Sequence, residues 1–232
     1  MINFFNRIET TRKRYFYAGL AAFVLLFSNS YREPWGYASL YAHPLYASPA
    51  AAPASNDERD MDKAADRIYR NGVNSYFAGE YWNCAQELII LLDFYPQFDK
   101  IDGVVYYIGE SLNEMEMNNP ALKMFKYLIK MYPQSEYVPN AMLGIQKIYF
   151  REEKFNEVMN YYFLIIKNNY ENEVADAARY YHAQSNFYLN KWENAILILR
   201  RINPASEYYD HALYTTGLAM LKKKEFAPQY SI

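Results

Sequence analysis

The segment 104–133, VVYYIGESLNEMEMNNPALKMFKYLIKMYP, decides the fold of this chain. Apolar residues recur at helical spacing around the small residue Gly109, and a polar break follows them. A second periodic run carries Ala121 and Phe125 and ends at Pro133. The pattern predicts two helices joined by a short turn, closed by a proline that a helix does not continue through.

The same pattern recurs along the chain at a step of 37 residues, with a last step of 34 between the small positions. The counterparts of Gly109 are Gly72, Gln146, Ala183 and Gly217. Those of Ala121 are Cys84, Val158 and Ala195, and those of Phe125 are Leu88, Tyr162 and Leu199. A fixed period of this size is the mark of a helical solenoid. Because one helix pair cannot bury both of its apolar faces, each pair is expected to stack on the next. Small residues are expected where the two helices of a pair cross, with the bulky residue beside the crossing.

We therefore predict an all-α fold over residues 62–232, with about four and a half helix pairs. The expected helices are 62–78, 81–94, 99–115, 118–131, 136–151, 155–168, 172–189, 192–202 and 206–223. Gly79 marks the first turn between helices, and Pro96, Pro133 and Pro204 fall where a helix has to stop.

Composition excludes several classes of function. The formal net charge of −2 argues against a nucleic-acid partner, because neutralising phosphates needs a basic face. Only 8 glycines are present and no glycine-rich phosphate loop is among them. The single cysteine, Cys84, rules out an internal disulfide and is expected to be a small buried side chain. The 26 tyrosines suit a surface that is apolar in body and polar at the tip.

The first part of the chain has the layout of an export signal. A basic stretch containing Arg12, Lys13 and Arg14 precedes thirteen uncharged apolar residues, 15–27. That run is shorter than the roughly 20 residues of a spanning helix, which favours cleavage over a permanent anchor. We expect residues 1–52 to be a signal peptide or N-terminal anchor with its flanking segment, and 53–61 a flexible linker. The expected location is the periplasm or cell envelope; the alternative is anchoring in the inner membrane by residues 15–27.

The recurring signature, which is Gly109, Ala121-x-x-x-Phe125 and Pro133, resembles that of tetratricopeptide (TPR) repeats. The period of 37 residues is longer than the usual repeat, and the third repeat has Gln146 in place of the glycine. The resemblance implies a right-handed superhelical solenoid of antiparallel helix pairs. The closing sequences around Pro96 and Pro133 are also similar to bacterial periplasmic and envelope TPR proteins of the outer-membrane assembly and Tol-Pal-associated types.

In TPR solenoids the first helix of each pair lines the inner groove, so the resemblance also suggests a site. Residues three before and four after each small position lie two turns apart on one helix face. Here they form a mainly aromatic ladder. Glu110 stands where carboxylate-clamping TPR domains carry polar or basic residues, so a carboxylate ligand is not expected. The candidate peptide-binding residues are Tyr69, Tyr76, Tyr106, Glu110, Asn113, Phe150, Tyr180, Phe187 and Tyr214. The alternative is that much of the ladder is packing between neighbouring repeats.

Chemistry is not indicated elsewhere in the repeat region. His182 and His211 are far apart and have no metal-ligand spacing, so both are expected to be structural or surface residues. Glu110 and Glu114 lie one turn apart on a helix that we expect to face water. The sequence thus predicts no catalytic residue, no metal site and no cofactor.

The sequence taken together predicts an exported, non-catalytic scaffold that binds a protein or peptide segment of the envelope through an aromatic concave groove. Membrane contact is expected only through an uncleaved N-terminal segment. Two alternatives remain. The chain could be an architectural subunit that forms homo-oligomers through its open C-terminal end, where Leu213, Leu218 and Leu221 need cover, or a piece of a longer TPR protein.

Overall fold

The structure is a computed structural model that describes residues 56–168, 170 and 172–226. The chain divides into two units, residues 1–58 and 59–232, and the second holds nearly all of the described residues. The expected signal segment, 1–52, lies outside the described residues. Within the described ranges no helix is long and apolar enough to cross a membrane.

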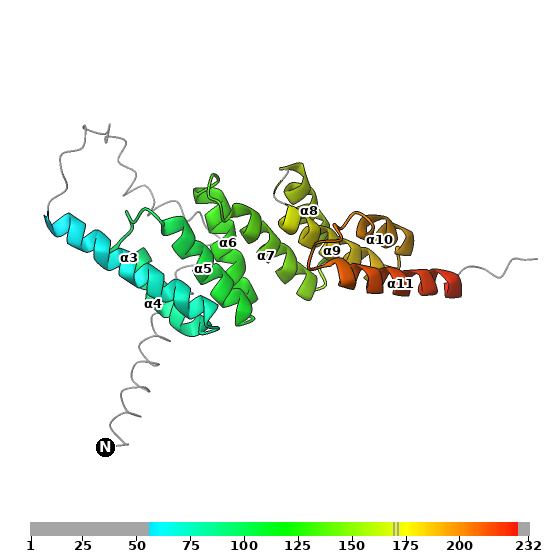
Figure 1. Cartoon of the computed structure of the whole chain (residues 1–232), viewed down its shortest axis with the longest axis horizontal. Helices are drawn as coiled ribbons and strands as arrows, with labels where there is room; N and C mark the ends of the chain where they lie inside the picture. The colour runs from blue at the N-terminus through cyan, green and yellow to red at the C-terminus, as the bar shows by residue number, and fades with distance from the viewer. Residues whose placement is uncertain (1–55, 169, 171, 227–232) are drawn as a thin grey trace, which may run out of the picture. The chain divides into compact units, whose positions relative to one another are not determined.

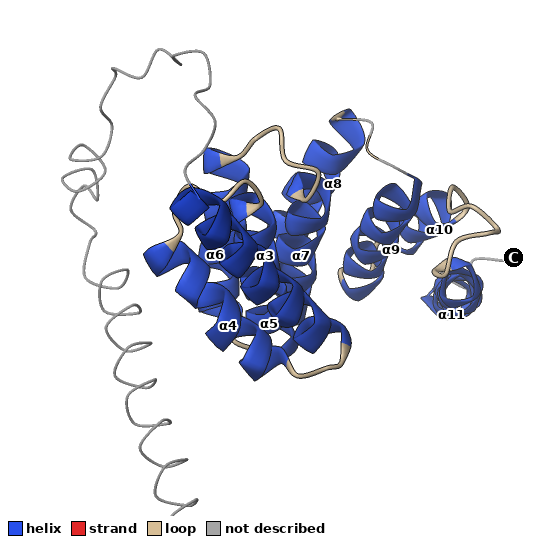
Figure 2. Cartoon of the chain, turned by 60° about the vertical axis from the view of Figure 1, so that its left-hand side comes forward, coloured by secondary structure: helices blue, strands red, loops and turns tan. Residues whose placement is uncertain are grey.

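The described part of the chain contains only helices and their connections, and no strand (Figure 2). Four helix pairs are followed by a single helix, which confirms the predicted all-α fold of about four and a half repeats. The pairs and the last helix are α3 (Asn56–Phe77) with α4 (Tyr81–Phe94), α5 (Ile101–Glu114) with α6 (Asn118–Met131), α7 (Val138–Arg151) with α8 (Phe155–Lys167), α9 (Asn172–Tyr188) with α10 (Trp192–Leu199), and α11 (Tyr209–Phe226).

Helix α3 begins earlier than predicted. It starts at Asn56 instead of residue 62, so residues 56–61 of the segment expected to be a linker are helical. The reason is visible in the sequence: no proline or glycine follows Pro53 before the helix, and the acidic residues at 57 and 58 suit the positive end of a helix dipole. The rest of the expected linker lies outside the described residues.

The helices stack in chain order (Figure 1). The second helices α6, α8 and α10 each pack on their own first helix and on the first helix of the next pair. Helix α4 packs on α5 and meets α3 where Leu88 lies against Gly72. The first helices α5, α7, α9 and α11 also contact one another in sequence. Residues at equivalent positions of successive first helices are thereby brought to the same side of the stack, as the period predicts.

The crossings within pairs confirm the role of the small residues. A methyl group added at Gly72 would lie 2.6 Å from Leu88, and one at Gly109 would lie 2.8 Å from the ring of Phe125. Leu88 and Phe125 are themselves fully buried. The alternation of small and bulky positions therefore sets how closely the helices of a pair approach.

The third repeat solves the same packing problem with different residues. Gly144, two positions before the expected small site, accepts the ring of Phe125 from the preceding repeat, and a methyl group there would lie 2.7 Å from it. Gln146, at the small site itself, is buried and donates hydrogen bonds of 3.2 Å to the carbonyls of Val158 in α8 and Ala178 in α9. A long polar side chain is tolerated at this crossing because its amide replaces packing with hydrogen bonds.

The turn inside each pair has one repeated geometry. The second of the three residues in each connection has a positive φ, which is +57° at Glu116, +56° at Glu153, +59° at Asn190 and +77° at Gly79. The amide after it bonds back to the carbonyl five residues earlier, for example from Met117 to Leu112 at 2.8 Å. This is the left-handed helix end that glycine favours. Sequence reasoning identified it only at Gly79, because three of the four repeats use a residue other than glycine.

Candidate peptide-binding surface

The first helices of repeats one and two bring the predicted tyrosines into one group, here termed the first aromatic cluster. Tyr106 stacks on Tyr137 with ring centroids 4.7 Å apart and contacts Tyr107 at 5.2 Å. Tyr69 meets Tyr107 at 6.4 Å, and its hydroxyl lies 3.4 Å from that of Tyr137. The full cluster is Tyr69, Tyr76, Phe77, Tyr81, Phe98, Tyr106, Tyr107 and Tyr137.

The second aromatic cluster forms around α7 and α9. Phe150 meets Tyr181 at 5.3 Å and Tyr188 at 5.9 Å, while Phe155 stacks on Tyr188 at 5.8 Å. Tyr180, a predicted site residue, contacts Tyr181 at 5.5 Å. The full cluster is Phe150, Phe155, Tyr180, Tyr181, Phe187, Tyr188 and Tyr208. The predicted ladder is thus two clusters of rings on successive first helices.

Between the two clusters lies a polar stretch on α5 and α7. Asn113, predicted to contact a ligand, is buried, and its side-chain oxygen accepts a hydrogen bond from Arg151. Arg151 also donates to Asn118 at 3.0 Å. The prediction that Asn113 contacts a ligand is therefore wrong, because its side-chain amide is buried and holds α5 to α7.

Glu110 also differs from its prediction. Instead of facing water beside Glu114, it is partly buried against α7, with a carboxylate oxygen 3.2 Å from the place a methyl group would take on Gly144. Burial raises the pKa of Glu110 to about 7; Lys147, Asn113 and Arg151 act in the opposite direction, and Glu114 adds to the rise. The missing side chain of Gly144 leaves this space, which no helical spacing could have shown.

Replacing Glu110 by Gln is expected to stabilise the fold above pH 7. The folded pKa of about 7 exceeds the unfolded value of 4.5, so the unfolded chain loses its proton first and wild-type stability falls as the pH rises from 4.5 to 7. Allowing for solvent screening, the difference corresponds to about 1–3 kcal/mol. Urea unfolding at pH 4.5 and pH 8 should show the gain of Glu110→Gln only at pH 8, with Glu157→Gln, exposed on α8, as the control. An equal gain at both pH values would refute the assignment.

Two rings outside the predicted set of site residues are the most exposed of their clusters. Phe77 and Tyr188 directly follow the predicted Tyr76 and Phe187, and their exposed fractions are 72% and 59%. Tyr76, Tyr106, Tyr180 and Phe187 are only partly exposed. The signal that could have found Phe77 and Tyr188 is their shared position in the period, one residue after the predicted Tyr76 and Phe187.

The remaining predicted residue, Tyr214, is exposed on α11 beside Leu213 and Gly217. Burial raises the pKa of Tyr106 and raises that of Tyr107 to about 12, so these two tyrosines keep their protons at ordinary pH. They can therefore offer hydroxyl hydrogen bonds next to apolar ring faces, which is the usual character of tyrosine at a binding surface.

Groups capable of chemistry are not gathered at these clusters. Cys84 is buried, and burial raises the pKa of its thiol, as expected of a packing residue. His182 is buried against the ring of Tyr162 at 4.2 Å. In the described ranges no group of three His, Cys, Asp or Glu side chains is placed to hold a metal ion.

Comparison with known proteins agrees with this fold. Residues 104–135 match the tetratricopeptide repeat family. A point mutant of MamA has a similar fold with a TM-score of 0.52 and 14% identity, over 72% of this chain and 94% of that one. The MamA structure designated AMB-1 gives 0.52 and 13%, over 74% of this chain and 96% of that one. No curated protein sequence matches.

At such low identity the MamA likeness shows the fold alone. The TPR match and the stacked helix pairs together indicate a protein–protein interaction scaffold, since repeat solenoids present extended binding surfaces. Folds of this kind are typically non-catalytic.

Proposed function

We propose that this chain is an exported, non-catalytic scaffold that binds a protein partner of the cell envelope through the two aromatic clusters. The observation that carries the proposal is the exposure of Phe77 and Tyr188 at the rims of clusters whose other rings are packed. Large exposed aromatic residues on a rigid support are the usual anchors of protein interfaces.

The geometry favours an apolar segment as the ligand. Each cluster offers ring faces and edges held by neighbouring rings, as Tyr106 is held by Tyr137 and Tyr107. Preformed helices limit the ordering cost of binding, so burial of apolar partner surface supplies the affinity. The partly buried carboxylate of Glu110 between the clusters disfavours a ligand with a carboxylate at its centre.

The polar stretch between the clusters suggests how a ligand is oriented. Arg151 is exposed and is anchored by Asn113 and Asn118, so its guanidinium is held in place. A partner segment with apolar residues at both ends and a hydrogen-bond acceptor between them would fit this order of chemistry. Export to the envelope is supported by the basic-then-apolar layout of residues 1–27.

Capture of partners from envelope extracts tests the proposal. The full chain carrying Phe77→Ala and Tyr188→Ala is expected to retain a partner at least about tenfold less well than wild type, because both exposed anchors are removed. Quantitative mass spectrometry of the retained proteins, from parallel columns of each variant, provides the measurement.

A matched control separates this surface from general stickiness. Phe94→Ala with Tyr127→Ala removes a 72% and a 41% exposed ring from the second helices α4 and α6. This pair should capture the same partner as wild type. Equal losses in both variant pairs, or no loss in the first, would contradict the proposed surface. Recovery of the chain itself only from the cytoplasm would contradict the proposed location.

A further inference from the structure

Helix α11 has two apolar faces, and the described residues pack against only one of them. Ala212, Thr215 and Ala219 are buried against α9 and α10, where Gln184 donates a 2.9 Å hydrogen bond to Thr215. Figure 2 shows α11 end-on with α9 and α10 on one side of it. The opposite side is here termed the bare face, and its residues are Asp210, Leu213, Tyr214, Gly217, Met220, Leu221 and Lys224, all exposed.

The period shows what this face lacks. Leu213, Gly217 and Met220 correspond to Val105, Gly109 and Leu112 of the second repeat, which are all buried. Gly109 meets the ring of Phe125 from α6, whereas a methyl group at Gly217 would meet nothing within 4 Å. The bare face is thus a surface with the shape and chemistry of a helix-packing seam, and no described helix covers it.

The chemistry of the bare face is self-complementary about Gly217. Asp210 and Lys224 each lie seven residues from it, Leu213 and Leu221 four, and Tyr214 and Met220 three. At about 100° per residue, all of these fall within about 60° of Gly217 around the helix. An antiparallel copy of α11 centred on Gly217 would therefore place Asp210 opposite Lys224, Leu213 opposite Leu221 and Tyr214 opposite Met220.

From this arrangement we infer that two copies of the chain associate through α11, antiparallel about a two-fold axis at Gly217. The glycine lets the two helix backbones approach closely, and the four apolar side chains of each copy cover one another. The acidic first turn of each helix meets the basic last turn of its partner, which also opposes the two helix dipoles. One helix pair is a small interface, so the dimer is weak and concentration-dependent. This inference is independent of the proposed function.

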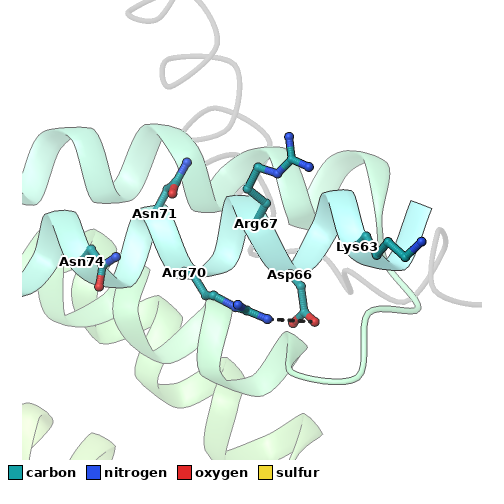
Figure 3. A pocket seen from close by; sticks show the side chains of 6 residues that line it. All are labelled: Lys63, Asp66, Arg67, Arg70, Asn71 and Asn74. Carbon is teal, nitrogen blue, oxygen red and sulfur yellow. Dashed lines mark ion pairs between the residues drawn. The ribbon is translucent and has the colours of Figure 1, made fainter. Parts of the chain in front are cut away.

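The other end of the repeat region argues against a head-to-tail chain of copies. Helix α3 has a polar stripe made of Lys63, Asp66, Arg67, Arg70, Asn71 and Asn74, which line a shallow pocket of about 340 Å³ (Figure 3). Arg70 pairs with Asp66 at 3.7 Å within this stripe. Packing the bare face against the charged stripe of α3 would bury charges and yield little free energy, whereas the bare face matches a second copy of itself.

Cysteine crosslinking of the full chain tests the orientation. The native Cys84 is fully buried, so an introduced cysteine on α11 is the reactive one. Mixing Leu213→Cys with Leu221→Cys chains is expected to give at least about fivefold more disulfide dimer than either variant alone, because antiparallel pairing sets these positions opposite each other. More dimer from Leu213→Cys alone would indicate a parallel pair and overturn the inference.

Sedimentation of the full chain at several concentrations tests the surface. Met220→Glu is expected to weaken dimerisation at least about thirtyfold, since the two-fold axis places two charges in the seam. Met131→Glu is the matched control, since Met131 on α6 is 51% exposed and Met220 is 46% exposed. The apolar run 15–27 is present in all variants and cannot cause a difference between them.

Charge exchange gives a third readout. Asp210→Lys and Lys224→Asp should each weaken the dimer, and an equal mixture of the two should restore it, because both ion pairs re-form in the mixed dimer. A chain that stays monomeric up to about 100 µM, well above the range of weak specific dimers, would overturn the inference. In that case slow modification of Gly217→Cys would indicate that another segment or a different protein covers the face.

Discussion

Replacing Phe125 by Ala is expected to reduce the free energy of unfolding by about 3–5 kcal/mol. The ring is fully buried and lies between two glycines of successive first helices, Gly109 and Gly144. Removing the ring leaves a cavity that neither glycine can fill, because glycine has no side chain. Urea unfolding followed by far-ultraviolet circular dichroism measures the loss.

The comparison requires a phenylalanine without such contacts. Phe94 on α4 is 72% exposed, and Phe94→Ala should change the unfolding free energy by less than about 0.5 kcal/mol. A second test fills the space at Gly144. Gly144→Ala places a methyl group 2.7 Å from the Phe125 ring, so it should destabilise wild type more than it destabilises Phe125→Ala, in which only the approach to the Glu110 carboxylate at 3.2 Å remains. Additive effects of the two substitutions would contradict the close contact between the Phe125 ring and Gly144.

Acid should destabilise the wild type through His182, and replacing it by Phe should remove that sensitivity. Burial lowers the pKa of His182 from 6.5 to about 4, and its Nδ1 atom has no hydrogen-bond partner. The unfolded chain therefore takes up the proton first, and stability falls as the pH drops from about 6.5 to about 4. The loss attributable to this residue is about 3 kcal/mol.

The measurement is the difference in unfolding free energy between His182→Phe and wild type at pH 7 and pH 4. The substituted ring can keep the contact with Tyr162, so the variant should be near wild type at pH 7 and more stable at pH 4. His211→Phe, at an exposed position on α11, controls for the added apolar ring. A constant difference across this range would sink the proposed role of burial.

Most of the helix boundaries follow from local sequence. The ends of α4 and α6 agree with the prediction, and those of α5, α7 and α8 differ by no more than two residues. Helical periodicity and prolines are read within one turn or one connection, so they need no knowledge of the rest of the chain. The start of α3 differs from the prediction because the linker prediction rests on composition and not on helical periodicity.

The candidate surface was predicted only in part. Helical spacing correctly brought Tyr69 and Tyr106 together in one cluster and Phe150 and Tyr180 in another. Helical spacing did not show that Asn113 is buried, because its burial depends on where the first helix of the next pair lies. The role of the two clusters in binding remains a prediction.

The sequence by itself determined the repeat, the helix pairs and the places where small residues allow helices to cross, because these recur at a constant step along the chain. Only the tertiary structure decided that Gly144 receives the ring of the preceding repeat, that Glu110 is desolvated beside it, and that α11 keeps one apolar face uncovered. The physical reason is that a period specifies which residues are equivalent, whereas burial depends on which neighbour each equivalent residue meets.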